Sequence, residues 1–195
     1  MKAELLDEHR DINVCHHDWW DCVYEMFIED MEQVGIEVDP DDICFSGFWS
    51  QGDGASFTGS ITNLRLYLKH FHNDDEFPEL RKLLERDAYI DVAWTRLSHH
   101  YVHEYTLDFS VEVEPQWFLF ETHGSGLREL AAAALEKLHG EEAEQLRLAV
   151  KENVQGLCKK LYRQLEEEYD YLTSDEAVAE TITANDLDTD TDDEE

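Results

Sequence analysis

A row of carboxylates near the N-terminus is the feature of this sequence best suited to a chemical role. Its members recur at steps of three and four with no Lys or Arg among them: Asp18, Asp21, Glu25, Glu29 and Glu32. Side chains at this spacing share one face of a helix, over about 21 Å at a rise of about 1.5 Å per residue. One DNA strand carries a phosphate about every 3.4 Å along its axis, so a rigid row of acids can stand in for part of a polyanion. The spacing therefore predicts an acidic binding surface.

A second group of acids is predicted on the outer face of a strand. From Tyr101 to Glu114 apolar and polar residues alternate, with the apolar set on one side and the acids on the other. A period of two places alternate side chains on opposite faces of a sheet, so one face is expected to be core and the other wet and acidic. The contacts expected on the wet face are Asp108, Glu112 and Glu114.

The net charge is far larger than solubility requires. The chain has 47 acidic and 15 basic residues, a formal charge of -32, whereas a charge of roughly 2 to 8 units suffices to keep a small domain in solution. Like charges at this density repel one another and destabilise the compact state. They also exclude direct nucleic-acid binding and favour a basic protein partner. The alternative is an acidic surface of the cytosolic or halophile type, with no partner implied.

The glycine-rich stretch from Ile43 to Ile61 predicts a hairpin. Gly52-Asp53-Gly54 has the composition of a tight turn of the primed type. A phosphate-binding loop should run from a strand into a helix, whereas this one leads into a second strand. As an alternative, the loop forms a ligand or metal site together with nearby histidines, and the residues of that site are Asp53, Gln51 and Ser50.

No arrangement of His, Cys or Ser supports catalysis. His99, His100 and His103 lie where the pattern predicts strand and turn, not on one helix face, and they lack the Glu of a zinc-protease motif. The four cysteines have no CxxC spacing, which favours reduced core thiols. No local signature of a nucleophile and its base is present. We therefore expect a protein that is not an enzyme and has neither a cofactor nor a bound metal.

The elements that must hold these residues form an α+β pattern. We expect a single domain over residues 1–184, in which a small antiparallel sheet of two hairpins packs against a long N-terminal helix and C-terminal helices. The predicted elements are a helix over 14–35, hairpins over 43–61 and 89–114, helices over 126–172 and a disordered acidic tail over 185–195. No signal segment or long apolar run is present, so the chain is expected to be a cytoplasmic protein with no membrane contact.

Two segments resemble a known group of sequences. These are SGFWSQGDGASFTG, from Ser46 to Gly59, and YLTSDEAVAETITAN, from Tyr171 to Asn185. Together they are similar to a family of small, mostly uncharacterised proteins carried by bacteriophages and mobile elements. The resemblance implies a phage-type origin, in which very acidic small proteins block restriction, CRISPR or other nucleic-acid enzymes by mimicking DNA. It carries over no catalytic residue.

These observations predict an acidic inhibitor or regulator that mimics DNA. It would act in the cytoplasm of a host cell and bind the basic nucleic-acid groove of a host defence protein, as a monomer or a homodimer. The alternatives are the ligand- or metal-binding module described above, and an adaptor whose acidity is incidental. An adaptor would bind through a surface dominated by Trp and Phe.

Overall fold

The computed structural model describes residues 3–15, 18–85, 92–97, 102–109 and 141–187. Helices and strands occur in separate runs along the chain and the strands pair antiparallel, which confirms the α+β class. Backbone contacts divide it into two compact units, one of Met1–Glu25 with Arg163–Glu195 and one of Met26–Tyr162. The expectation of a single domain stays a prediction. In the described part, no helix has the length and apolar character needed to span a membrane.

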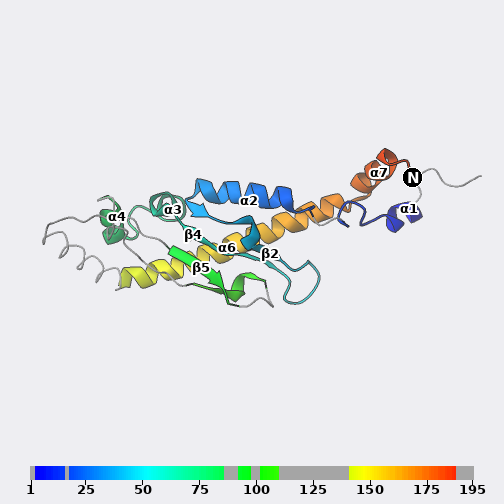
Figure 1. Ribbon diagram of the computed structural model, residues 1–195. Coiled ribbons are helices and arrows are strands. Elements are labelled where there is room, and N and C mark those ends of the chain that lie inside the picture. Colours follow the sequence, from blue (N-terminus) through cyan, green and yellow to red (C-terminus); the bar gives the residue numbers. More distant parts are fainter. Residues whose placement is uncertain (1–2, 16–17, 86–91, 98–101, 110–140, 188–195) are drawn as a thin grey trace, which may run out of the picture. The chain divides into compact units, whose positions relative to one another are not determined.

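The unit Met26–Tyr162 contains two small antiparallel sheets (Figure 1). One has the strand order β1 (Ile36–Glu37), β4 (Gly59–Ile61), β5 (Val92–Arg96) and β6 (Leu107–Asp108). The other pairs β2 (Ile43–Phe45) with β3 (Ala55–Phe57). Strands of two to five residues cannot persist alone in water, so side-chain packing must hold them.

An aromatic core joins these sheets to a helix. The ring of Phe57 on β3 meets Phe27 at 5.1 Å and Trp94 on β5 at 5.6 Å, both edge to face. Phe27 belongs to α2 (Asp21–Gln33), and all three side chains are buried. The buried indole Nε1–H of Trp94 donates to the carbonyl of Phe57 at 3.0 Å, which satisfies both groups. The core therefore links α2 to both sheets.

Three further helices contribute residues to this unit. They are α3 (Leu64–Phe71), α4 (Pro78–Leu84) and the long α6 (Glu141–Leu172). The side chain of Asn63 accepts from the Leu66 N–H and caps α3, as its residue type favours. Glu142 at the start of α6 accepts from the Glu79 and Leu80 N–H groups, which lie in the first turn of α4. These contacts tie α6 to α4.

The other unit is built from both ends of the chain. It contains α1 (Ala3–Glu8) and α7 (Asp175–Ala184), and Ser174 caps α7 by accepting from the Ala177 N–H. Arg10 donates to the Thr173 carbonyl at 3.0 Å and pairs with the Asp175 carboxylate. Hydrogen bonds therefore hold the N-terminal turn against the segment before α7.

Several predicted boundaries need correction. The helix predicted over 14–35 begins at Asp21, because the chain before it makes turns, with Asp21 N–H donating to Asp18 O. The segment 43–61 does not form one hairpin, since β3 pairs with β2 whereas β4 pairs with β1 and β5. In the C-terminal prediction, α6 begins at Glu141; residues 126–140 and the tail from 188 onward lie outside the described part.

The second predicted hairpin, over 89–114, is described by the structure only at residues 92–97 and 102–109. Strands β5 and β6 pair as expected, with Thr95 opposite Asp108. The strand predicted over 101–114 is not formed at residues 104–106, because His103 caps the 3₁₀ helix η2 (Glu104–Thr106) by accepting from the Tyr105 N–H through Nδ1. Residues 86–91, 98–101 and 110–114 lie outside the described residues.

The cysteines are free thiols, as the lack of CxxC spacing favours, but they do not all lie in the core. Cys158 on α6 is fully buried, and this burial raises the pKa of its thiol to about 12. Cys44 is half-buried, whereas Cys15 and Cys22 are exposed. The prediction of core thiols is therefore correct for Cys158 and wrong for Cys15 and Cys22.

Candidate functional site

The helix α2 displays a row of carboxylates on its outer side. Its buried face is formed by Val23, Phe27 and Met31, at steps of four residues. The exposed side carries the acids that we call the α2 row: Asp21, Glu25, Glu29 and Glu32. At a rise of about 1.5 Å per residue the row spans about 16 Å. These four acids thus lie on the exposed side of a helix whose other side is buried, as the spacing predicts.

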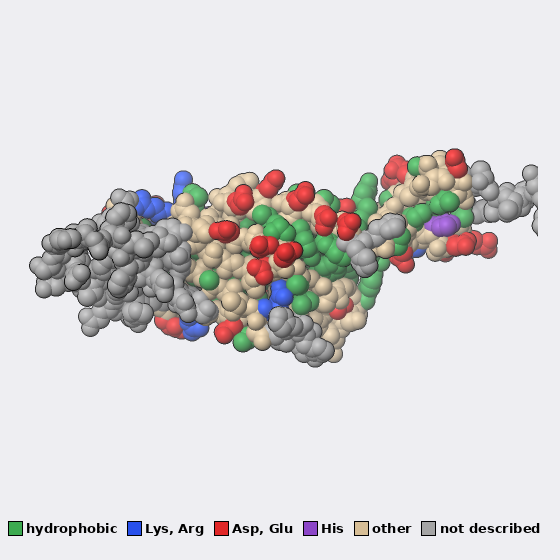
Figure 2. Space-filling view, in the orientation of Figure 1, with side chains coloured by type: hydrophobic (Ala, Val, Ile, Leu, Met, Phe, Trp, Pro, Cys, Tyr) green, Lys and Arg blue, Asp and Glu red, His purple; other side chains and the backbone are tan. Residues whose placement is uncertain are grey.

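No ion pair to the α2 row is formed within the described part of the chain. The lysine that reaches this helix, Lys160 on α6, pairs with Asp30 at 2.6 Å instead. Its neighbour Lys159 lies 3.7 Å from Glu104 and donates to the Tyr105 hydroxyl at 3.4 Å. Figure 2 shows acidic side chains gathered over and around α2, with a basic side chain at the lower edge of the group in that view.

The remaining predicted acids are distributed differently. Asp18 is exposed in the turn that precedes α2. Asp108 is exposed on β6, and its charge contributes to the raised pKa of Arg147 on α6, after the larger effect of the Glu144 carboxylate that hydrogen-bonds Arg147. Asp108 is therefore partly balanced by a cation, unlike the α2 row. Glu112 and Glu114 lie outside the described residues.

The loop between β2 and β3 is longer than the predicted two-residue turn. Nine residues, 46–54, separate the paired strands, because Phe45 pairs with Ala55. The Ser46 N–H donates to the Gly54 carbonyl at 3.1 Å, and the Gly54 N–H donates to Ser46 Oγ at 3.2 Å. These bonds close the base of the loop and replace the predicted turn at Gly52-Asp53-Gly54.

The alternative ligand residues do lie together in this loop, but one is used to shape it. Asp53 Oδ2 accepts from the Ser50 N–H at 2.6 Å, and the Asp53 N–H donates to the Ser50 carbonyl at 3.0 Å. Ser50 and Gln51 are exposed. In the ranges that the structure describes, no group of three His, Cys, Asp or Glu residues could hold a metal ion. The Asp53 carboxylate thus has a structural role in closing the loop.

Sequence reasoning did not single out Trp49 at the tip of this loop. It is 77% exposed, the largest value among the large hydrophobic residues that the structure describes. Phe48 beside it stacks on Phe45 at 5.8 Å and meets Tyr162 of α6 at 5.5 Å. The density of aromatic residues between Ile43 and Ile61 was the available signal, but composition does not tell which ring is buried and which is displayed.

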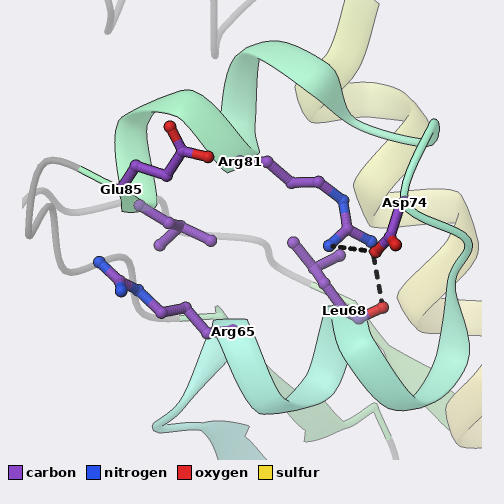
Figure 3. Close-up of a pocket in the computed structure, with 6 residues that line it drawn as sticks. Arg65, Leu68, Asp74, Arg81 and Glu85 are labelled. Carbon is purple, nitrogen blue, oxygen red and sulfur yellow. Dashed lines mark hydrogen bonds and ion pairs between the residues drawn. The ribbon is translucent and has the colours of Figure 1, made fainter.

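A pocket of about 320 Å³ lies between α3 and α4 (Figure 3). Arg65 and Arg81 stand at its two ends, with Asp74 and Glu85 also on its wall. Arg81 is already occupied, because it donates to the carbonyls of Glu76 at 2.9 Å, Asn73 at 2.8 Å and Leu68 at 3.2 Å. The mixed charges and these bonds indicate that Arg81 fastens α3 to α4 and that the pocket's polar groups serve the fold.

Comparison with known proteins assigns most of the chain to a family. A family model described as Domain of unknown function (DUF8835) matches residues 19–175. No curated protein and no solved structure matches the chain. The matched range includes α2, the loop 46–54 and α6, which carry the features described above.

Proposed function

The chain belongs to the DUF8835 family of unknown function, and from the chemistry of its surface we propose that it is a non-enzymatic inhibitor or regulator that mimics DNA. The α2 row would take the place of backbone phosphates in the basic nucleic-acid groove of a host protein. The observation that supports this most directly is that four exposed acids lie along one helix and form no ion pair with the described residues, while the nearby Lys160 pairs with Asp30.

Binding would draw on the same forces that bind DNA to such grooves. Lys and Arg side chains in a nucleic-acid groove gather counterions or phosphates, and acids held on a rigid helix displace them. The steps of three and four residues along α2 separate neighbouring acids by about 4.5 to 6 Å along the axis, so several can face one groove at once. The formal charge of -32 would steer the encounter from a distance and make its rate fall with salt.

The resemblance of Ser46–Gly59 and Tyr171–Asn185 to phage and mobile-element proteins adds a biological setting to the proposal. The protein would act in the cytoplasm of a host cell, against an enzyme of restriction, CRISPR or related defence. Such an enzyme must hold nucleic acid in a basic groove, which is the surface that the α2 row complements.

The proposal is tested by capture and competition. The full chain is immobilised, host lysate is passed over it at low salt, and bound proteins are eluted with duplex DNA and identified by mass spectrometry. We expect nucleic-acid-binding proteins in the DNA eluate, and we expect them to be lost with the variant E25Q/E29Q/E32Q. D30N is the matched control, because Asp30 lies on the same helix but pairs with Lys160.

Two results would count against this function. Captured proteins that duplex DNA does not displace would show that the bound surface is not a nucleic-acid groove. Capture that is unchanged by E25Q/E29Q/E32Q would show that the α2 row is not the contact.

A further inference from the structure

The loop 46–54 holds an aromatic side chain outward on a fixed support. Gly47 and Gly52 have φ of +107° and +102°, backbone conformations that residues other than glycine rarely adopt. The bonds of Asp53 to Ser50 and of Gly54 to Ser46 fix the loop from inside. The conformation that displays Trp49 is therefore set before any partner arrives, which lowers the entropic cost of binding.

The support beneath Trp49 is itself aromatic. The Phe48 ring lies between Phe45 and Tyr162 and meets the Trp49 ring at 5.8 Å, edge to face. Trp49 is nonetheless 77% exposed, so one of the largest apolar side chains of the protein remains largely in water. Tryptophan is the residue type most enriched at the energetic centres of protein interfaces, and a rigid exposed indole is suited to that role.

The charge of the protein selects the kind of group that this indole would meet. Between Ile43 and Ile61 the only charged residue is Asp53, and the whole chain carries -32. Such a charge opposes contact with a second copy of the chain and attracts cations. Among cationic side chains, arginine stacks on an indole face more readily than lysine does, because its guanidinium is planar and weakly hydrated.

We propose that Trp49 stacks on an arginine side chain of a basic protein partner and anchors the interface with that partner. This inference rests on the proposed function, since it assumes the same basic partner. The two surfaces would have separate roles: the α2 row supplies long-range attraction, and the loop 46–54 selects arginine over lysine.

The test uses the full chain and two peptides of equal charge, octa-arginine and octa-lysine, with binding measured by calorimetry at low salt. We expect W49A to weaken octa-arginine binding about two- to fivefold, the range of an exposed cation–π contact, and to leave octa-lysine binding nearly unchanged. W49F, which keeps a ring, should restore part of the loss. L97A is the matched control, because Leu97 is also an exposed apolar side chain, 66% exposed.

A second readout reports on Trp49 directly. Each of the five tryptophans has one indole N–H group that is detectable in nitrogen-15 NMR spectra, and the signal that W49F removes identifies Trp49. We expect that signal to shift on addition of octa-arginine, and to shift less with octa-lysine.

The outcomes separate this inference from the proposed function. If W49A leaves octa-arginine binding unchanged while E25Q/E29Q/E32Q abolishes it, the anchor is refuted and the acidic mimic stands. If neither variant changes binding, both are refuted. An equal loss of affinity for both peptides would refute the arginine contact in favour of an apolar docking site. A dimer of the wild-type chain in ultracentrifugation that W49A dissociates would refute it in favour of a second copy.

Discussion

The α2 row should lower the stability of the protein that displays it, and the variant E25Q/E29Q/E32Q should therefore be more stable than the wild type. Like charges three or four residues apart on a helix destabilise it by about 0.2–0.5 kcal/mol per pair. The variant removes three such pairs, because Asp21 also faces Glu25. Gln and Glu have similar helix propensities, so the change in charge dominates.

Glu32 adds a second contribution. It lies in the last turn of α2, which has no basic residue, and the negative end of the helix dipole disfavours an acid there by about 0.3–1 kcal/mol. Together with the repulsion, we expect E25Q/E29Q/E32Q to raise the free energy of unfolding by about 1–2.5 kcal/mol at low salt. A change of 1 kcal/mol corresponds to a rise in Tm of about 2–4 °C for a chain of this size.

Urea unfolding at 20 mM and at 1 M NaCl measures this effect. Salt at about 1 M shortens the screening length to about 3 Å, so the gain should nearly vanish there. The control D30N should instead be neutral or destabilising by up to about 1 kcal/mol, since Asp30 pairs with Lys160 on the surface. A loss of stability in E25Q/E29Q/E32Q at low salt, or an equal gain in D30N, would refute the claim that the α2 row is unbalanced.

Three further predictions concern the contacts around α3. R81A should lower the free energy of unfolding by about 2–3 kcal/mol in urea titrations, because it leaves the Asn73 and Glu76 carbonyls between α3 and α4 without their charged donor. K82A should change it by less than about 1 kcal/mol. Burial raises the pKa of Tyr67 to about 12. The stability that its neutral hydroxyl contributes is therefore present below about pH 10 and lost as the pH rises toward 12. In melts at alkaline pH, the Tm of Y67F should fall less with rising pH than the Tm of the wild type. The hydrogen bond from His72 lowers the pKa of Glu76 below its ordinary 4.5. The stability that the ionised Glu76 contributes is therefore present above pH 4.5 and lost as the pH falls through the lowered pKa. An acid unfolding curve that is the same for E76Q and the wild type would contradict this.

The sequence predicted well the features that depend on local periodicity. The apolar steps of Val23, Phe27 and Met31 place one side of α2 in the core, and all three are buried. Caps are also local, since a side chain reaches a backbone group only three residues away, as at Asn63. The exposure of the α2 row follows from the same periodicity.

Features set by competition between bonds could not be predicted in this way. The alternation around Tyr101 favours a strand, but the bonds of His103 to the Tyr105 N–H and of Thr106 Oγ1 to the His103 carbonyl favour a 3₁₀ turn instead. The loop 46–54 is closed by Ser46 and Asp53, which act across several residues. The display of Trp49 depends on that closure, so no pattern of residue types reveals it.

The hydrogen bond from Trp94 to the Phe57 carbonyl has a consequence for how the unit Met26–Tyr162 melts. It crosses from the sheet of β5 to the sheet of β3, and the Phe57 ring also touches Phe27 on α2. Neither ribbon of strands is long enough to survive by itself. When this hydrogen bond and the ring contacts are lost, both sheets should unfold together. We therefore expect one cooperative transition with no partly unfolded intermediate.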